Sequence, residues 1–184
     1  MNRLSLRAAP AAGLALALLL TGCADAVGDR TLARHELLAR SMMRAWESGD
    51  PEVLAESFWP DAIYDDFSSA TTWQGIEEIV DYKLELHRWG EGVTVDAVAV
   101  HPSPTGVTVE WVVAAIQSAP VAGLTDSVTG REVVLNGVTI LEVEGDRVAR
   151  AADYVDALPL VLQLGGRVEM PGGEVRELDG GPEG

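Results

Sequence analysis

The sequence predicts an α+β domain in which helices come first and an antiparallel sheet follows. Helical segments are expected in residues 31–58 and 77–88, whereas residues 93–156 alternate between apolar and polar side chains over long stretches. Short turns at Pro102–Gly106 and Glu144–Asp146 join the first and last pairs of these stretches. Helices followed by a meander of strands are typical of helices packed on one face of a curved sheet.

Three helices are expected before the sheet. The first, Thr31–Ser48, places Leu38, Met42 and Trp46 four residues apart on one face. Met42 and Trp46 either line a ligand pocket or belong to the ordinary core, and such a stripe is more often core. The sequence Gly49-Asp50-Pro51 then ends this helix and starts a short second one, Pro51–Phe58.

The third helix, Glu77–Arg88, follows a short strand, Ala62–Asp66. Its apolar stripe is expected to comprise Ile76, Ile79, Val80, Leu84 and His87. Four long strands come next: Val93–His101, Val107–Gln117, Arg131–Val143 and Arg147–Asp156. The connection 118–130 is longer than a hairpin needs, so it is either a lid or an extended β-arm.

The first thirty residues predict export. Residues 1–22 hold Arg3, Arg7 and a short apolar run, as a secretory signal peptide does. The run ends in Leu20-Thr21-Gly22-Cys23, which resembles the lipobox of a bacterial lipoprotein signal. Cys23, the only cysteine, is then the lipidation site, and residues 23–30 form a tether to the cell envelope. The domain proper spans residues 31–165, and residues 166–184, rich in Gly, Glu and Pro, are expected to be a disordered tail.

The net charge of the chain limits the kinds of molecule it is expected to bind. Loss of residues 1–22 removes two of the 13 basic residues and none of the 29 acidic ones, so the formal net charge falls from −16 to −18. A surface this acidic repels nucleic acid and anionic lipid headgroups and disfavours an acidic substrate. We therefore expect a small apolar ligand, no nucleic acid, and membrane attachment through the lipid alone.

The strand Arg147–Asp156 carries the main candidate for chemistry. Strand alternation places Ala149, Ala151 and Asp153 on one face. The two small alanine side chains would leave room for a ligand next to the carboxylate. An acid or base in an apolar pocket would be built in this way. The alternative is that Asp153 only caps the strand or forms a salt bridge. Tyr64 and Asp66 share a face of the strand Ala62–Asp66, where Asp66 is equally compatible with ordinary turn chemistry.

The sequence Asp153-Tyr154-Val155-Asp156, an apolar turn and Gln163-Leu164-Gly165 resemble the closing signature of SnoaL-like polyketide cyclases and limonene epoxide hydrolases. These families belong to the nuclear transport factor 2-like superfamily, and the resemblance covers roughly residues 37–165. It implies a cone-shaped fold with three N-terminal helices on a curved, mainly antiparallel sheet. It also implies that Asp153 is the base, that Tyr64 orients a water or substrate oxygen, and that Asp66 matches the proton-shuttling position of the ketosteroid isomerases.

The resemblance is incomplete on the middle strand. The epoxide hydrolases carry an Arg and a second Asp at the positions that align with Val112 and Ala114, so half of their proton relay is absent here. Epoxide opening needs a proton donor as well as a base, and Asp66 would supply the proton only if its pKa were high. The cyclases need essentially one Asp. The expected pocket residues are Met42, Trp46, Val112, Ala114, Asn136, Ala149 and Ala151.

Three functions remain open at this point: a cyclase or isomerase, an epoxide hydrolase, and a lipoprotein that binds an apolar molecule without converting it. No cofactor is expected, and no metal site, because His35, His87 and His101 lie on separate elements. The sheet face bearing Val98, Val100, Trp111 and Val113 is expected to be covered by a second copy of the chain in a homodimer.

Overall fold

The computed structural model describes the backbone of residues 14–177 and the side chains of residues 28–177. The helices are α1 (Leu14–Ser48), α2 (Pro51–Glu56), α3 (Ile76–Trp89) and α4 (Leu158–Gln163). The strands are β1 (Phe58–Asp66), β2 (Thr71–Gln74), β3 (Gly90–Ser103), β4 (Gly106–Gln117), β5 (Glu132–Glu144), β6 (Arg147–Val155), β7 (Val168–Glu169) and β8 (Val175–Arg176). The predicted α+β class is confirmed.

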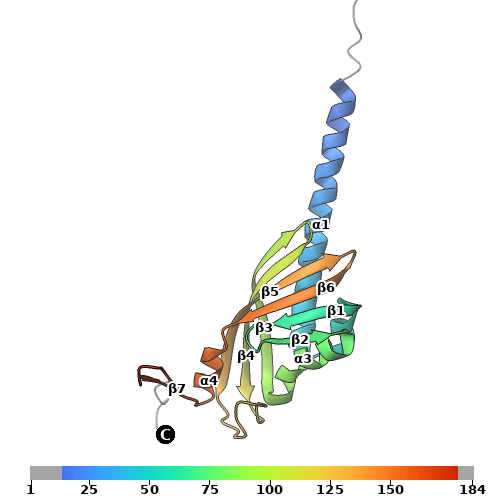
Figure 1. Cartoon of the computed structure of the whole chain (residues 1–184). Coiled ribbons are helices and arrows are strands. Elements are labelled where there is room, and N and C mark those ends of the chain that lie inside the picture. Colours follow the sequence, from blue (N-terminus) through green and yellow to red (C-terminus); the bar gives the residue numbers. More distant parts are fainter. Residues whose placement is uncertain (1–13, 178–184) are drawn as a thin grey trace, which may run out of the picture.

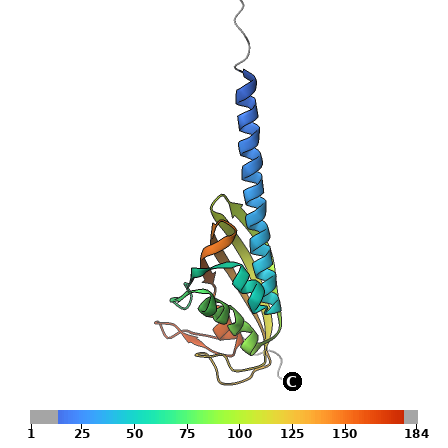
Figure 2. The ribbon, with the colours of Figure 1, turned by 90° about the vertical axis from the view of Figure 1, so that its right-hand side faces the viewer.

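Strands β1 to β6 form one twisted sheet in the order β2-β1-β6-β5-β4-β3 (Figure 1). All neighbours are antiparallel except β1 and β6, which run parallel and are connected through α3 and four strands, β2 to β5. Helices α1, α2 and α3 lie on one side of the sheet (Figure 2). We call the side that they cover the inner face and the opposite side the outer face.

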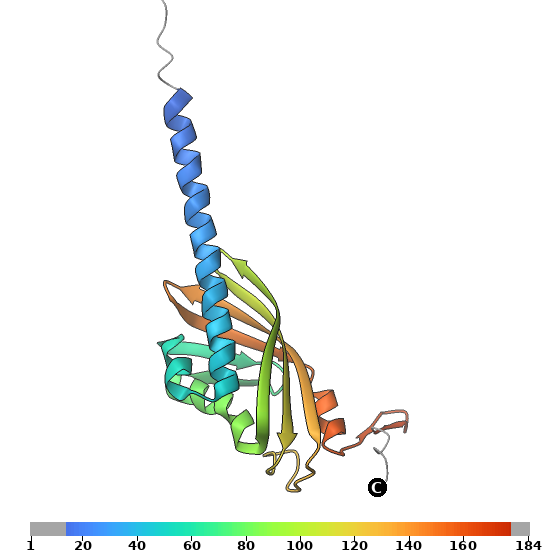
Figure 3. The same cartoon turned by 180° about the vertical axis from the view of Figure 1, so that it is seen from behind.

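Helix α1 crosses the inner face over β3 and β4 and then continues beyond the sheet toward its N-terminal end (Figure 3). The imidazole of His35 fixes the crossing, because its Nδ1 lies 2.8 Å from the Ser103 carbonyl oxygen and 3.2 Å from that of Gly106. His35 is buried, so this pairing satisfies polar groups that water does not reach. His87 is likewise a packed residue, with Nε2 2.6 Å from the Trp46 carbonyl oxygen.

The core lies between the inner face and the helices. Met42, Met43 and Trp46 of α1 meet Ile79 and Leu86 of α3 there, together with alternate residues of β4. Along β4 these alternate residues are Val107, Val109, Trp111, Val113 and Ala115, all buried. Apolar burial at this period is what fixes which side of β4 meets the helices.

The helix boundaries follow local chemistry. Asp50 caps α2, since its carboxylate accepts hydrogen bonds from the backbone N–H groups of Glu52 (3.0 Å) and Val53 (3.2 Å). Helix α2 ends at Glu56, earlier than predicted, because Phe58 already pairs with Val148 of β6 as the first residue of β1. The long strands agree with their predicted ranges to within three residues at each end.

Helix α1 is longer than predicted, because it begins at Leu14 and runs without a break through residues 23–30. That these residues form a tether stays a prediction. The segment after Gly166 is not structureless up to residue 177, because β7 and β8 pair as a small hairpin; residues 178–184 lie outside the described residues. The connection 118–130 is no β-arm: it folds around the buried amide of Gln117, which bonds Ala119, Ser127 and Thr129.

The predicted signal peptide, residues 1–22, lies largely outside the residues that the structure describes. Residues 1–13 are not described, and of residues 14–27, which include Cys23, only the backbone is. Among the described residues, no helix combines the length and the apolar composition of a membrane span.

Candidate active site

Asp153 lies on the inner face of β6 and is almost wholly buried, with 1% of its surface exposed. One carboxylate oxygen, Oδ2, accepts a hydrogen bond from Lys83 Nζ at 2.9 Å, and the other, Oδ1, accepts one from the Thr139 hydroxyl. The Tyr82 hydroxyl adds a long contact to Oδ2 at 3.4 Å. The buried carboxylate is therefore held as an ion pair with bonds to both oxygens.

Lys83 is the functional residue that the sequence analysis missed. It lies on α3 four residues after Ile79 and three before Leu86, so the helix repeat puts it on the buried face between two core residues. The expected stripe used Leu84 instead, because lysine is rarely buried. The signal available in the sequence was this position: a lysine that interrupts an otherwise apolar Ile79-Lys83-Leu86-Trp89 stripe.

Aromatic rings surround the Lys83 ammonium group. Its Nζ lies 3.9 Å from the centre of the Trp46 ring, 4.7 Å from that of Tyr64 and 5.4 Å from that of Tyr82. These distances are within the range of cation–π attraction. The Trp46 indole also donates a hydrogen bond to the Lys83 carbonyl oxygen at 3.0 Å, which ties α1 to α3 at this point.

Thr139 is positioned by a second tryptophan. The Trp111 indole N–H donates to the Thr139 hydroxyl at 2.8 Å, and this hydroxyl in turn donates to Asp153. The Trp111 ring lies against its cross-strand neighbour Gly137, where any side chain would overlap the indole ring. A glycine on β5 is thus required for the chain of hydrogen bonds that ends at Asp153.

Tyr64 points into the same region from β1, and its register partner on β6 is Ala151. Burial, and then the negative charge of Asp153, raise the pKa of Tyr64 well above its usual value, so the phenol stays neutral. Its hydroxyl is buried and makes no hydrogen bond of standard geometry within the described residues, although Asp153 and Thr139 lie close enough to shift its pKa. Tyr64 does not itself line the cavity described below. An unpaired buried hydroxyl is costly in a folded protein and is typical of a position that a ligand or water satisfies.

Asp66 is the register partner of Asp153 across the parallel pair β1 and β6. Burial favours a higher pKa for Asp66, but hydrogen bonds from Ser68 and Ser69 outweigh it, and the net effect is a lowered pKa. Asp66 is therefore a carboxylate at neutral pH and cannot be the proton donor that the sequence analysis considered. The cation that balances Asp153 is Lys83.

A cavity of about 180 Å³ opens beside this group. The cavity is lined by Asp66, Lys83, Asp153 and the Tyr82 ring. The pKa of the Tyr82 hydroxyl is raised by burial and then by the charges of Asp153 and Asp66. Most of the remaining wall is apolar and includes Trp46, Leu86, Trp89, Trp111, Val113, Leu135, Val155 and Leu160. Gln163 holds α4 at the end of this cavity, since its side chain bonds both the N–H and the carbonyl oxygen of Val134.

The predicted pocket residues on the middle strands were assigned to the wrong face. Val112, Ala114 and Asn136 lie on the outer face, where Val112 and Asn136 are cross-strand partners in a shallow hollow. Conversely, Trp111 and Val113, expected on the exposed face, are buried and line the cavity. Both strands alternate as predicted, and only the choice of the buried side was wrong.

Three further pocket predictions fail for local reasons. Ala149 is the extra residue of a β-bulge, since Glu142 pairs with Arg150 and Val143 with Val148; it faces Trp59 on the outer side. Ala151 is on the expected inner face, but the neighbouring strands bury it completely. Met42 is a core residue away from the cavity, whereas Trp46, Asp66 and Asp153 do line it. Within residues 28–177, no cluster of three His, Cys, Asp or Glu side chains suits a metal ion.

Helices on one face of a curved, mostly antiparallel sheet, with a cavity between the two layers, define the nuclear transport factor 2-like class of α+β folds. Within that class, the chain belongs to the family of SnoaL-like domains, whose family model matches residues 39–151. No match is found among curated protein sequences.

Solved structures agree with this fold. A polyketide cyclase candidate from Xanthomonas campestris superimposes with a TM-score of 0.66 at 18% identity, covering 73% of this chain and 98% of its own. AclR from Streptomyces galilaeus, a hydroxylase candidate, gives 0.64 at 18%, with 73% and 97% covered. A protein of ketosteroid isomerase-like fold from Catenulispora acidiphila, solved with trimethylamine, gives 0.58 at 22%, with 70% and 92% covered. Identities this low establish a shared fold only.

Proposed function

We propose that this protein is an acid/base catalyst of the cyclase or isomerase type, acting on a small, mainly apolar carbonyl compound. The observation that carries the proposal is the ion pair between Lys83 and Asp153, which is buried and nevertheless lines a cavity. Membership in the SnoaL-like family, with polyketide cyclase candidates among the fold neighbours, supports it.

Asp153 would remove a proton from the carbon next to the carbonyl group and return it at another position or after ring closure. Negative charge then develops on the carbonyl oxygen. The Lys83 ammonium has three N–H donors and gives one to Asp153, so a second N–H can bind that oxygen. Once Asp153 has taken the proton and is neutral, the ammonium balances the charge of the enolate instead. The unpaired Tyr64 hydroxyl is a further donor beside the same group.

Exchange of the acidic C–H hydrogens of ketones in D₂O, followed by NMR, tests proton removal without knowledge of the natural substrate. Asp153→Asn should lower the exchange rate on the order of 100-fold or more, the usual scale for loss of a general base. Asp156→Asn is the matched control, because Asp156 lies three residues further along and is exposed. Thermal unfolding should accompany each measurement, since Asp153→Asn also removes the partner of Lys83.

A protein that only binds its ligand is the second candidate, favoured by the lowered pKa of Asp66, the carboxyl group that is the register partner of Asp153. Such a protein would bind ketones without exchanging their hydrogens in the wild type, and Asp153→Asn would change affinity by about 1 to 2 kcal/mol, the scale of one hydrogen bond. The epoxide hydrolase hypothesis has less support, because Asp66 is ionised and no residue of the middle strands replaces the missing Arg and Asp.

The proposal places the protein at the cell envelope, as a lipoprotein attached through Cys23. The lipobox pattern supports this, and α1, which projects past the sheet, would hold the domain away from the bilayer (Figure 1). The mature chain should begin at Cys23, carry lipid and partition into detergent, and Cys23→Ala should release it. Intact-mass analysis that shows another N-terminus without lipid would contradict this.

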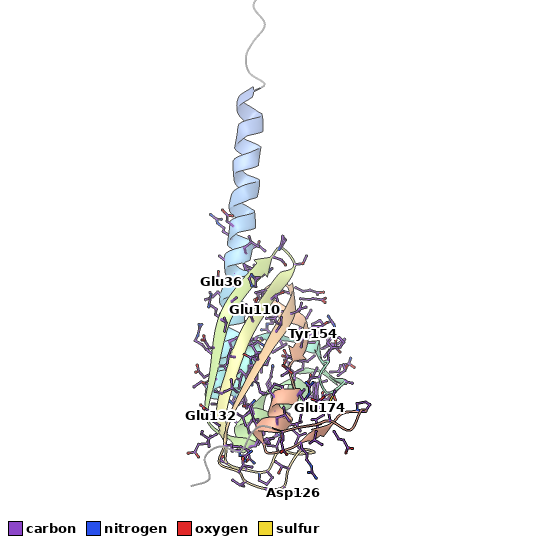
Figure 4. All side chains as sticks on the ribbon, turned by 90° about the vertical axis from the view of Figure 1, so that its left-hand side faces the viewer. Glu36, Glu110, Asp126, Glu132, Tyr154 and Glu174 are labelled. Carbon is purple, nitrogen blue, oxygen red and sulfur yellow. The ribbon has the colours of Figure 1, made fainter. Side chains whose placement is uncertain are left out.

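A homodimer through the outer face is also part of the proposal. Figure 4 views this face, where Glu110 and Tyr154 project from β4 and β6. Exposed apolar side chains gather there, with Tyr154 stacked on Phe67 at 4.8 Å and Val98 standing out on a β-bulge of β3. Tyr154→Lys should convert the dimer into a monomer in light scattering at micromolar concentration, while Glu174→Lys on the distant hairpin should not.

A further inference from the structure

The volume of the cavity limits the size of the ligand. At about 180 Å³ it is close to the roughly 150 Å³ of an apolar protein cavity that holds one benzene molecule. One six-membered ring with a short substituent fits such a space. A molecule of four fused rings does not, and its extra rings would have to remain outside, beyond the mouth.

The aromatic walls already contain a cation. Rings of tryptophan and tyrosine around an apolar space are the usual way in which proteins bind quaternary ammonium ligands. Here the Lys83 ammonium occupies that place, over the faces of Trp46, Tyr64 and Tyr82. A cationic ligand would meet both a filled aromatic site and a like charge a few ångströms away.

Anionic ligands are also disfavoured. Lys83 is neutralised by Asp153, and two further carboxylates line the cavity. Asp66 accepts hydrogen bonds from Ser68 and Ser69, and Glu85 is paired with Arg88. A ligand carboxylate or phosphate would therefore face uncompensated negative charge, in a chain whose formal net charge is −16.

An uncharged oxygen is different, because the cavity offers it donors. Asp153 is the sole hydrogen-bond acceptor in contact with Lys83 Nζ among the described residues, so Lys83, which lines the cavity, keeps N–H groups free for a ligand. A carbonyl oxygen can accept from these groups without being charged.

We propose that the cavity selects uncharged, single-ring molecules that carry a carbonyl oxygen, because Lys83 occupies the aromatic site that a cationic ligand would use and Asp66 repels anions. This inference rests on the proposed function only in that the ligand enters the cavity beside Asp153, and it concerns binding, so it can be tested apart from turnover.

Three compounds of matched shape separate the charge classes: cyclohexyl methyl ketone, cyclohexanecarboxylate and cyclohexyltrimethylammonium. Binding can be followed by tryptophan fluorescence of the purified full chain, because Trp46, Trp89 and Trp111 line the cavity. The ketone should bind at least about 10-fold more tightly than either ion, because both ions lose hydration, the carboxylate meets the negative charge of Asp66, and the ammonium group finds the aromatic faces already occupied by Lys83. Equal or tighter binding of an ion by the wild type would overturn the proposal.

Size is tested with ketones of one, two and four rings. Affinity should fall as rings are added, and Leu135→Ala, which enlarges the cavity, should restore binding of the two-ring ketone. Leu124→Ala is the matched control, because Leu124 lies outside this cavity and is half exposed. A four-ring ketone that binds the wild type as well as the one-ring ketone does would contradict the size limit.

The role of Lys83 is tested by Lys83→Met, which frees the aromatic faces and leaves Asp153 without its cation. The order should then reverse, with the ammonium compound binding more tightly than the ketone. Should this variant fail to fold, Lys83→Met combined with Asp153→Asn removes both charges, and the ratio of ammonium to ketone affinity should still rise. An unchanged ratio would show that Lys83 does not set the selectivity.

The outcomes also distinguish this inference from the proposed function. Ketone binding with the expected selectivity but without hydrogen exchange would uphold the inference and remove the catalytic proposal. Hydrogen exchange in a four-ring ketone, with no binding of the one-ring compound, would uphold catalysis and overturn the inference.

Discussion

The two faces of β6 carry ion pairs of the same type in opposite surroundings. On the outer face, Arg150 joins Asp65 at 2.6 Å and Glu142 at 2.8 Å, with 35% of the arginine side chain exposed. On the inner face, Asp153 joins Lys83 at 2.9 Å with almost no exposure of either side chain. The two pairs have similar distances but differ in solvent exposure, so the distances alone do not tell how much each pair affects stability.

Water is the cause of the difference. It solvates the partners of Arg150 if that residue is removed, and exposed pairs of this kind contribute below about 1 kcal/mol. No water compensates a buried charge whose partner is lost. The inner pair is therefore unsuited to be a simple stabilising device, which is consistent with its place in a cavity.

The largest expected effect comes from breaking the inner pair. Lys83→Met should lower the free energy of unfolding by about 3 to 5 kcal/mol, because Asp153 stays buried without a cation. Lys83→Met with Asp153→Leu should recover most of this loss, since no unpaired charge remains. Arg150→Met on the outer face is the control, and urea denaturation measures all three; a similar loss for Arg150→Met would remove the contrast between the faces.

The next effect concerns Gly137, which leaves room for the Trp111 indole on the inner face. Gly137→Ala should destabilise the fold by about 1 to 3 kcal/mol, the range for overpacking, because its methyl group overlaps the ring. It should also slow ketone hydrogen exchange, as Trp111 positions Thr139 against Asp153. Gly172→Ala, in open space on the hairpin, should change neither quantity.

A smaller effect of opposite sign is expected at Tyr64. Its buried hydroxyl lacks a partner, so Tyr64→Phe should raise the free energy of unfolding by about 1 kcal/mol. The same change should weaken ketone binding if this hydroxyl is a ligand donor. Tyr154→Phe on the outer face, with an exposed hydroxyl, should leave thermal stability unchanged; loss of stability in Tyr64→Phe would mean that the hydroxyl has a partner in solution.

The smallest effect is a dependence on pH. The folded-state pKa of Asp66 is lowered below the usual 3.8, so its ionised form is stabilised by folding. That contribution is fully present above about pH 4 and is lost as the pH falls through the folded-state pKa. The unfolding free energy of Asp66→Asn should therefore vary less with pH below 4 than that of the wild type, as denaturation at pH 3 to 6 will show.

The helices and long strands could be predicted because each is specified by neighbours in the chain. Asp50 caps α2 through its own turn, and alternation marks β4 and β5 over their whole length. Strand parity also placed Tyr64 with Asp66, and Asp153 on the face of the site. These features need only periodicity and local hydrogen bonds, which a sequence displays directly.

What the sequence did not decide was which side of a strand would be covered. Val112 and Val113 are the same residue type, and only the packing of α1 and α3 buries one and leaves the other outside. The bulge at Ala149 shifts the parity of β6 by one residue through its pairing with β5, which lies in no local pattern. The burial of Lys83 was missed because a lysine is rarely buried without a carboxylate partner, and the partner here, Asp153, lies far away in the sequence. Local periodicity thus determined the elements and the candidate base, whereas the cavity, its resident cation and the ionisation of Asp66 arise from contacts between segments far apart in the chain, which exist only once it has folded.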